Sequence, residues 1–410
     1  ILHFLNNFIF TFLISPIYSY SNNQSFVDKN IIYIFLFILI FTIFSFLIKP
    51  INNIRNLDQK IRLYFIAFIY TISIIYSSTL IFNYQIHVSA SIFIYLFLLL
   101  VLLSLSNIYI SRALMIDLDI FIVGTSYKFT NNDYQILKEL KINYYLYDSI
   151  EDYLKINNII QKKIIINNSL ITNTAFKKMI NINHEFDKTY DIYYFLNKFI
   201  RKINFDDETI KNITKYNKMT LTSKIIIDLS VIIFFIPILL VALPISFLLV
   251  KYQSKGNFIF KQNRAGKDGK LFQIYKIRSM HNYNEASSFL SELDQKRIFN
   301  FGKFLRKSRL DELPQFLNVL KGDMHIAGPR AEWDYLQKLY IKNIDNYELR
   351  NVVSPGITGF AQVMFRYAHN EEDSREKFMF DLYYIKNWTI WLEMEIGIKT
   401  VQVMINKKGF

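Results

Sequence analysis

Residues 225–250 read IIIDLSVIIFFIPILLVALPISFLLV, and this apolar run decides what kind of fold the chain can adopt. It is longer than the roughly 20 residues that span a bilayer as a helix. Lys224 precedes it and Lys251 follows it, each with further lysines beyond. Because Lys and Arg stay on the cytoplasmic side of a membrane, a simple spanning helix would leave one cluster on the wrong side. We therefore expect a re-entrant membrane helix over residues 224–251.

Two prolines within the run supply the physical means of bending back. Pro237 and Pro244 each lack a backbone donor, and their rings clash with the preceding turn. Asp228 is costly in lipid unless it is paired, and Lys224 lies one helical turn earlier. We expect these two side chains to pair as an interfacial anchor. An ordinary spanning helix, kinked at its prolines, is the alternative interpretation.

Four earlier apolar segments each approach the length of a spanning helix. They cover residues 2–18, 31–48, 63–82 and 88–108. Lys49, Arg55, Lys60 and Arg62 lie between the second and third segments, and the positive-inside rule places them in the cytoplasm. The fourth segment then returns the chain to the cytoplasmic side. Anchoring alone accounts for these helices as well as a functional role does.

Strand and helix patterns alternate after this membrane region. Residues 119–123 (DIFIV) are typical of a buried strand, with further strands at 144–147 and 164–166 and a helix at 133–140. Such alternation predicts a parallel, Rossmann-like sheet. Gly124 stands alone where a dinucleotide fingerprint needs several glycines, so we expect no bound nucleotide there.

The chain thus reads as a membrane protein of mixed α and α/β class in three regions. We expect a four-helix transmembrane region over residues 1–112, a Rossmann-like domain over 113–205, and a domain with the re-entrant helix over 206–410. The net charge of +14 suits nucleic acid, anionic lipid or phosphorylated substrates. Without cysteine there is no thiolate metal site, so any metal is expected to bind oxygen.

A second informative stretch is SRLDELPQFLNVLKGDMHIAGPR, residues 308–330. Ser308 is a suitable helix N-cap and Asp311 falls where a capping-box acid would lie. Capping cannot explain both Asp311 and Glu312, because adjacent helical residues point to different faces. A carboxylate near a helix N-terminus and near Arg306 or Arg309 should stay ionised, as a nucleophile must.

Cations and glycines gather upstream of this stretch. Gln262, Arg264 and Gly266 lie in KQNRAGKDGK, and Lys276 and Arg278 lie in FQIYKIRSM. Together these residues could clamp a diphosphate. Each of them alone is more often a solvated surface charge.

These motifs resemble the bacterial sugar transferases, the polyprenol-phosphate phosphoglycosyl transferases that start glycan assembly on a lipid carrier. The resemblance covers residues 224–386, through KIIID, QNRAG, FQIYKIRSM, LDELPQFLNVLKGDM, GPR, PGITGFAQV and DLYYIKN. The preceding regions are similar to those of the large members, which initiate exopolysaccharide, capsule or related glycans. The resemblance implies a monotopic catalytic domain on the cytoplasmic face of the bacterial inner membrane, in a multi-pass protein.

The resemblance also implies a reaction. The Asp311 carboxylate would attack the sugar-bearing phosphate of a nucleotide-diphosphate sugar, such as a UDP-sugar, with Glu312 as the Mg²⁺ ligand. A covalent phosphosugar enzyme would form and UMP would leave. Undecaprenyl phosphate would then attack the intermediate. Residues implied to contact substrate are Lys276, Arg278, Arg306, Arg330, Gln362 and Asp381.

The expected partners are the nucleotide sugar, undecaprenyl phosphate and the lipid bilayer, with a homodimer allowed and no nucleic acid. The chain departs from the family pattern at Val241, which replaces a Ser-Pro break, at Ala331, which ends Pro-Arg-Pro, and at Ser354, where an arginine often precedes Pro-Gly. One alternative is a catalytically silent scaffold for polysaccharide assembly, which the intact acid pair disfavours. A membrane-tethered nucleic-acid binder is another, but the sequence has no recognisable base-reading motif.

Overall fold

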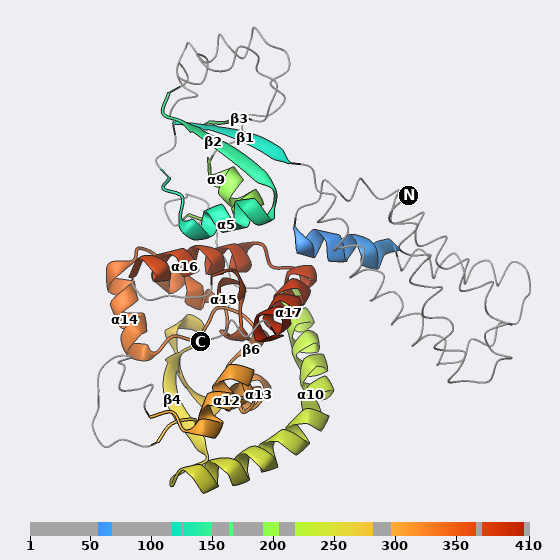
Figure 1. Ribbon diagram of the computed structural model, residues 1–410, viewed down its shortest axis with the longest axis vertical. Helices are drawn as coiled ribbons and strands as arrows, with labels where there is room; N and C mark the ends of the chain where they lie inside the picture. Colours follow the sequence, from blue (N-terminus) through green and yellow to red (C-terminus); the bar gives the residue numbers. More distant parts are fainter. Residues whose placement is uncertain are drawn as a thin grey trace, which may run out of the picture. The chain divides into compact units, whose positions relative to one another are not determined.

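The computed structural model describes residues 56–67, 117–124, 127–149, 164–166, 192–204, 218–281, 297–365 and 371–405 (Figure 1). The chain divides into two compact units, Ile1–Ile192 and Tyr193–Phe410. The expected spanning segments 2–18, 31–48 and 88–108 lie outside the described residues. Only the start of segment 63–82 is described, within a helical stretch whose described residues are 57–67.

The first unit contains the expected parallel sheet. Its strands are β1 (Leu118–Val123), β2 (Ile142–Tyr147) and β3 (Ile164–Ile166), and α5 (Asn131–Glu139) joins the first two. Both β2 and β3 pair with β1 in parallel, in the order β2-β1-β3. That order of described strands occurs in flavodoxin-like doubly wound sheets. The predicted parallel pairing is therefore confirmed.

Helix α5 begins before the expected residue 133 because Thr130 caps it. The Asp133 amide donates to Thr130 Oγ1 at 3.3 Å, and the Thr130 amide donates back to Asp133 Oδ2 at 3.0 Å. This reciprocal pair satisfies backbone donors that a helix N-terminus otherwise leaves free.

The second unit begins with a short segment that packs into its interior. This segment comprises α9 (Ile192–Phe195), the π-helical turn η2 (Leu196–Ile200) and residues 201–204. Its apolar side chains Phe195, Leu196, Ile200 and Ile203 are buried. The compact unit thus starts a dozen residues before the boundary expected at 205/206.

Helix α10 (Lys218–Gln253) has 36 residues and runs through both prolines. Figure 1 shows it curving along the second unit. At 1.5 Å per residue it extends about 54 Å, against about 30 Å for a bilayer core. Among the described residues, its stretch Thr220–Gln253 is the single helix whose length and apolar composition would suffice to cross a membrane.

The remaining elements build the body of the second unit. In chain order they are β4 (Ile259–Ala265), η4 (Lys267–Gly269), β5 (Leu271–Ile277), α12 (Asn300–Ser308), η5 (Leu310–Glu312), α13 (Gln315–Leu320), β6 (His325–Ala327), α14 (Asp334–Asn343), η6 (Tyr347–Val352), β7 (Gly356–Thr358), α15 (Phe360–Met364), α16 (Glu371–Lys386) and α17 (Ile390–Ile405). Strands β4 and β5 form an antiparallel hairpin, whereas β6 and β7 pair in parallel.

Close backbone contact explains the glycines of the PGITG motif. A Cβ atom added to Gly356 would lie 2.1 Å from the Gly328 amide nitrogen, and one added to Gly359 would lie 2.2 Å from the Gly328 carbonyl oxygen. Residues 356–358 form strand β7, which pairs with β6. Glycine is required at these positions because the two backbone segments lie too close for a Cβ atom between them.

Candidate active site

Asp311 and Glu312 lie in the single turn η5, directly after α12. Ser308 ends α12 and donates its hydroxyl back to the Phe304 carbonyl at 2.7 Å, so the expected N-cap at this residue is wrong. Arg309 adopts the left-handed conformation, with φ of 55°, and separates the two elements. Both acids are buried, with 8% of each residue exposed. Capping accounts for neither of them.

Three cations surround the Glu312 carboxylate. Lys276 Nζ donates to it at 2.9 Å, and guanidinium nitrogens of Arg309 and Arg330 lie at 3.6 and 3.9 Å. Burial alone raises the pKa of Glu312, but these cations and the Lys276 hydrogen bond lower it to about 2. Glu312 is therefore ionised throughout the neutral range.

Asp311 has the opposite balance of effects. Burial and the adjacent Glu312 charge raise the pKa of its carboxyl to about 6, although Lys276, Arg306 and Arg309 lower it. The expectation that nearby arginines alone keep this group fully ionised needs correction, because desolvation outweighs their attraction. At pH 7 the carboxylate form still dominates. Neighbouring carboxyls with separated pKa values are typical of acids with different roles.

The structure divides the other predicted phosphate contacts into two groups. Lys276 on β5, Arg306 on α12 and Arg330 after β6 gather around the acid pair; Arg306 also donates to Ser279 Oγ at 3.1 Å. Arg278 is used differently: its guanidinium donates to the Ser254 carbonyl at 2.5 Å and to the Lys255 carbonyl. It caps the C-terminal end of α10, where the last carbonyls lack helical partners.

Asp381 supports the site indirectly. It is buried on α16 and accepts a hydrogen bond from Arg350 at 2.9 Å. Arg350 in turn donates to the Arg330 backbone carbonyl at 3.0 Å. Burial raises the pKa of Asp381 to about 6 even with Arg350 beside it. These contacts fix the backbone that carries the Arg330 cation.

Gln362, on α15, is the remaining predicted contact residue. Both atoms of its side-chain amide are buried, and neither has a hydrogen-bond partner within the part of the chain that the structure describes. A buried amide without partners costs free energy. Such a group is suited to receiving a polar ligand.

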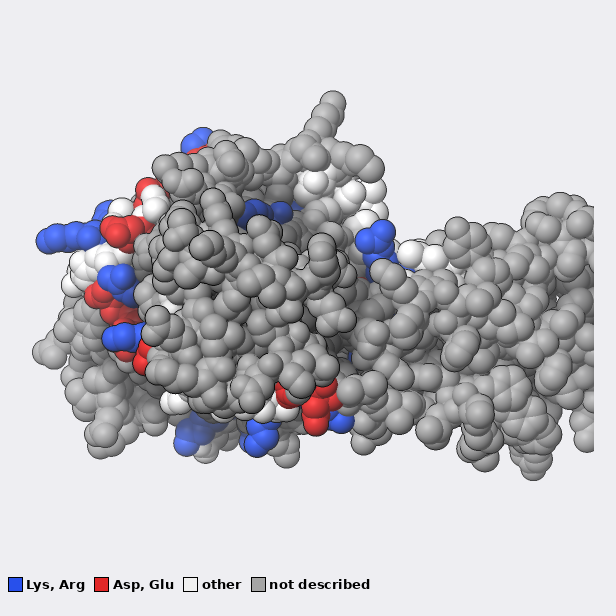
Figure 2. All heavy atoms as spheres, turned by 90° about the horizontal axis from the view of Figure 1, so that it is seen from above, with Lys and Arg blue, Asp and Glu red and all other residues white. Residues whose placement is uncertain are grey.

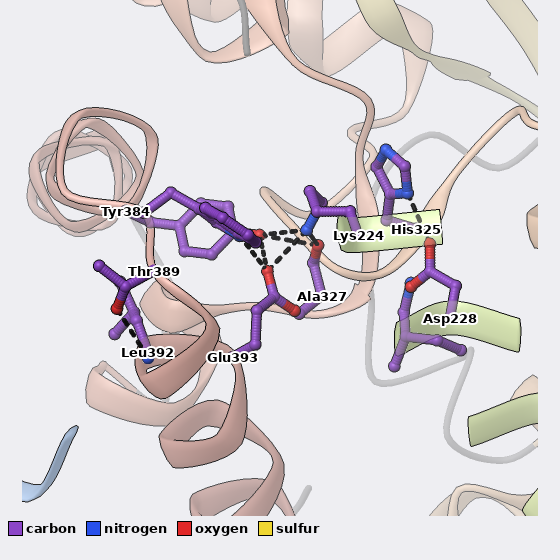
Figure 3. Close-up of polar contacts among 10 residues, drawn as sticks. Lys224, Asp228, His325, Ala327, Tyr384, Thr389, Leu392 and Glu393 are labelled. Carbon is purple, nitrogen blue, oxygen red and sulfur yellow. Dashed lines mark hydrogen bonds and ion pairs between the residues drawn. The ribbon is translucent and has the colours of Figure 1, made fainter. Parts of the chain in front are cut away.

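The start of α10 is tied to the strand that leads to Arg330 (Figure 3). Lys224 Nζ donates to Glu393 at 2.6 Å, to Tyr384 Oη at 2.7 Å and to the Ala327 carbonyl at 2.9 Å. Asp228 accepts from the Ile326 amide at 2.9 Å.

The other contact of Asp228 is with His325, whose Nδ1 lies 2.6 Å from the carboxylate. The expected pairing of Lys224 with Asp228 is thus replaced by two separate anchors to the body of the unit. The buried partners that make these anchors lie about 100 to 170 residues away in sequence.

The C-terminal end of α10 is tied to the same unit. Val250 packs with Ile277, Phe299 and Leu305 in one buried cluster. The Phe301 amide donates to Gln253 Oε1 at 2.8 Å. Between the two ends, Pro237 and Pro244 lie on exposed positions of the helix.

The acid pair fits a hard divalent cation. Magnesium is bound through one or two carboxylates plus substrate phosphates, and Asp311 and Glu312 supply adjacent carboxylates. Burial, followed by the Glu312 charge, raises the pKa of Asp311 to about 6, so a cation bound beside the pair would favour its ionised form. No cluster of three metal-ligating side chains occurs among the described residues, and a substrate-completed site does not need one.

Several residues that organise the site were not anticipated from the sequence. Arg350, Tyr384 and Glu393 each form buried contacts that position β6 or Arg330. The available signal was an acid in an apolar helical stretch, since Glu393 and Glu395 interrupt IWLEMEIGI. Such acids need buried partners.

Residues 219–407 match the family model described as bacterial sugar transferase. Over 162 residues the chain is 43% identical to a UDP-N-acetylgalactosamine-undecaprenyl-phosphate N-acetylgalactosaminephosphotransferase of Aeromonas hydrophila, covering 39% of this chain and 38% of that protein. It is 41% identical over 192 residues to a UDP-glucose:undecaprenyl-phosphate glucose-1-phosphate transferase of Klebsiella pneumoniae, covering 45% and 40% respectively. The match thus spans about two fifths of the length of these relatives.

A shorter relative is covered almost completely. The uncharacterized sugar transferase EpsL of Bacillus subtilis is 36% identical over 187 residues, which are 45% of this chain and 89% of that protein. With the acid pair and its cations inside the matched region, the chain belongs to the bacterial sugar transferase family.

Proposed function

We propose that this protein transfers a sugar 1-phosphate from a UDP-sugar to undecaprenyl phosphate. The observation that carries the proposal is the buried Asp311 and Glu312 pair, whose pKa values of about 6 and about 2 are separated within a cluster of cations. The names of relatives that match this region describe the same kind of transfer. Those names differ in the sugar, so the proposal stops at the class of UDP-sugars.

In the first step the Asp311 carboxylate attacks the phosphorus that bears the sugar. A bond forms from the carboxylate oxygen to phosphorus, and the bond to the bridging diphosphate oxygen breaks. UMP leaves with that electron pair, and an aspartyl phosphosugar remains. In the second step an oxygen of undecaprenyl phosphate attacks the same phosphorus, the carboxylate leaves, and a lipid diphosphate sugar forms.

The surrounding residues lower the cost of bringing these charges together. Lys276, Arg306 and Arg330 offer cations to the phosphate oxygens, and burial strengthens their effect. Glu312 holds Lys276, Arg309 and Arg330 in place and would also hold Mg²⁺. When bound, Mg²⁺ neutralises charge that develops on the phosphates.

The contacts of α10 support a re-entrant arrangement in the bilayer. Both ends of the helix bind the same compact unit, through Lys224 and Asp228 at one end and Val250 and Gln253 at the other. A spanning helix would separate its two ends by the membrane thickness. Large apolar side chains between the ends, among them Phe234, Leu240 and Leu248, are more than 60% exposed and suit a lipid environment.

We place this helix at the cytoplasmic face of the bacterial inner membrane, where UDP-sugars and the lipid phosphate can both arrive. The four earlier spanning segments and a homodimer stay predictions from the sequence. The nucleic-acid alternative receives no support from the face shown in Figure 2, where the described basic side chains are interspersed with acidic ones.

The test is to capture the covalent intermediate. Purified protein in detergent with Mg²⁺ is incubated with a panel of UDP-sugars without lipid phosphate, and its intact mass is measured. We expect one sugar phosphate to be added to the wild type and none to Asp311→Asn. Because the attacking group must be deprotonated and its pKa is about 6, the rate of adduct formation should fall about tenfold from pH 7 to pH 5.

A panel that yields neither adduct nor UMP release would overturn the proposed transfer. An Asp311→Asn variant that still turns over normally would overturn the covalent route while leaving the overall reaction standing. Addition of undecaprenyl phosphate should discharge the adduct as a labelled lipid.

A further inference from the structure

A small pocket lies beside Glu312, between β4, β5 and the segment after β6. Its charged lining residues are Arg264, Lys276 and Arg330, and the buried amide of Gln315 closes another side. It encloses about 230 Å³ including its open mouth. Its closed interior, about 10 Å³, has room for only one water-sized group. A whole nucleotide therefore does not fit inside, whereas a phosphate at the open mouth can place one oxygen among the lining cations.

Arg264 enters this pocket with unused hydrogen-bonding capacity. One of its terminal nitrogens donates to the Ala331 carbonyl at 3.2 Å. Its Nε is buried and has no hydrogen-bond partner among the described residues. Burial, followed by the charge of Arg330, lowers the pKa of Arg264 to about 10, which leaves it cationic at neutral pH. A partly buried guanidinium whose Nε has no partner among the described residues is matched by a bidentate anion.

Lys276 links the pocket to the acid pair. It lines the pocket and donates to Glu312 at 2.9 Å, and its charge also acts on Asp311. Arg264 interacts electrostatically with Glu312, whereas the cations that act on Asp311 are Lys276, Arg306 and Arg309. Two of the pocket's cations, Lys276 and Arg330, lie 2.9 and 3.9 Å from the Glu312 carboxylate, so the pocket lies on the Glu312 side of the pair.

We propose that Arg264, Lys276 and Arg330 form the subsite for the phosphate of the nucleotide that is not attacked, the one that leaves as UMP. This inference rests on the proposed function. When the sugar-bearing phosphorus of a nucleotide sugar lies at Asp311, its second phosphate must lie beside that residue. The pocket offers cations to this second phosphate next to Glu312.

The subsite also has a role in the chemical step. When the bridging bond breaks, its electron pair moves onto the leaving phosphate, which gains one negative charge. Cations that contact this phosphate bind it more strongly as the charge develops, so they accelerate the step. Arg264 would thus be a substrate-binding residue that affects both the affinity for nucleotide and the rate of adduct formation.

The test compares UMP with uridine, because the two differ only in the phosphate. Calorimetry on the full chain in detergent gives both affinities for the wild type, Arg264→Gln, Arg264→Lys and Lys261→Gln. Lys261 is the matched control, since it lies exposed on the same strand β4 and the change removes the same charge.

We expect Arg264→Gln to weaken UMP about tenfold to a hundredfold, as for loss of a charge-assisted hydrogen bond, and to leave uridine unchanged. Arg264→Lys should recover part of the loss, because it keeps the charge without the fork of donors. Lys261→Gln should behave as wild type. Thermal unfolding of each variant confirms that it is folded.

Equal weakening of UMP and uridine, or no change for either ligand, would overturn the subsite. A third arm uses a short-chain prenyl phosphate: if Arg264→Gln weakens it and spares UMP, the pocket serves the lipid phosphate and the inference is wrong. The binding readout is separate from turnover. A wild type that transfers no sugar but prefers UMP through Arg264 would contradict the proposed function alone.

Discussion

Asp311 and Glu312 are neighbours in one buried turn, yet their pKa values are about 6 and about 2. Desolvation acts on both carboxyls, and the difference comes from the partners. Glu312 has a direct hydrogen bond from Lys276, whereas Asp311 feels its cations only at longer range and is repelled by Glu312. The less compensated carboxylate is the one proposed to attack phosphorus.

This imbalance predicts that Asp311→Asn stabilises the protein. The folded-state pKa is raised from 3.8 to about 6, so the folded state binds more protons between these values and its stability falls as pH rises through that window. Above pH 6 the full cost, about 1–3 kcal/mol, is present. Melting temperatures at pH 7.5 should therefore be higher for Asp311→Asn than for the wild type, and the difference should shrink near pH 4.

The matched control is Glu312→Gln. Three cations lower the pKa of Glu312 to about 2 in the wild type, so the ionised carboxylate stabilises the folded state at neutral pH. The substitution removes that charge and leaves Lys276 without its carboxylate acceptor. We expect this variant to melt at a lower temperature at pH 7.5. If both variants were destabilised to the same extent, the two carboxyls would not differ in pKa as described.

At the scale of elements, the local sequence of α10 predicts its helix, but residues far along the chain hold its two ends. Its apolar composition predicts a membrane helix, but its ends are held by Glu393, His325 and Phe301 from distant parts of the chain. The anchor at Lys224 also holds the Ala327 carbonyl, three residues before Arg330. Helix α10 and the segment that leads to Arg330 therefore share one polar network.

Cysteine labelling tests the arrangement of α10 directly. The chain has no native cysteine, so Thr222→Cys and Lys255→Cys each give a single site, one before and one after the apolar run. In inverted and right-side-out vesicles, a membrane-impermeant maleimide should label both positions from the cytoplasmic side. Labelling from opposite sides would exclude the re-entrant arrangement. Tyr252→Cys, at an 89% exposed position, serves as a check that labelling reports access.

At the scale of the molecule, the second compact unit begins before the family match, which starts at residue 219. Arg201 pairs with Glu395 at 2.7 Å and Lys202 with Glu376 at 2.5 Å, in buried positions. Arg201 also stacks over Phe360, the first residue of the helix that carries Gln362, at 4.7 Å from the ring centre. Segment 193–204 is therefore part of this unit.

Truncation should reveal this dependence. A chain that starts at residue 193 keeps both ion pairs and four buried apolar side chains, and one that starts at residue 206 loses them. Breaking a buried pair by removing one partner typically costs about 3–5 kcal/mol. We expect the longer chain to be monodisperse and the shorter one to aggregate or to melt at a strongly lowered temperature. Equal yield and melting temperature for both would contradict an integral role for the segment.

Much of the fold and the acid pair could be predicted from sequence. Periodicity identified the three parallel strands and α5. The resemblance to the sugar transferase motifs pointed to Asp311, Glu312, Lys276, Arg306 and Arg330, which the structure gathers. Roles that depend on partners were less predictable. Arg278 binds the carbonyl of Ser254 at the end of α10, and Asp381 pairs with the buried Arg350. Both partners are brought to these side chains by the fold.

The sequence by itself indicated an apolar helix of membrane-spanning length and the alternation of strands and helices, because these depend on residue type and local spacing. Its resemblance to a known family pointed to the acid pair Asp311 and Glu312. Only the tertiary structure decided the pKa of each acid, the partners of Lys224 and Asp228, and the unpartnered Nε of Arg264 among the described residues. Burial and charge at a site are sums over residues brought together from across the chain. Lys276 lies 36 positions before Glu312, and no local pattern states that the two will touch.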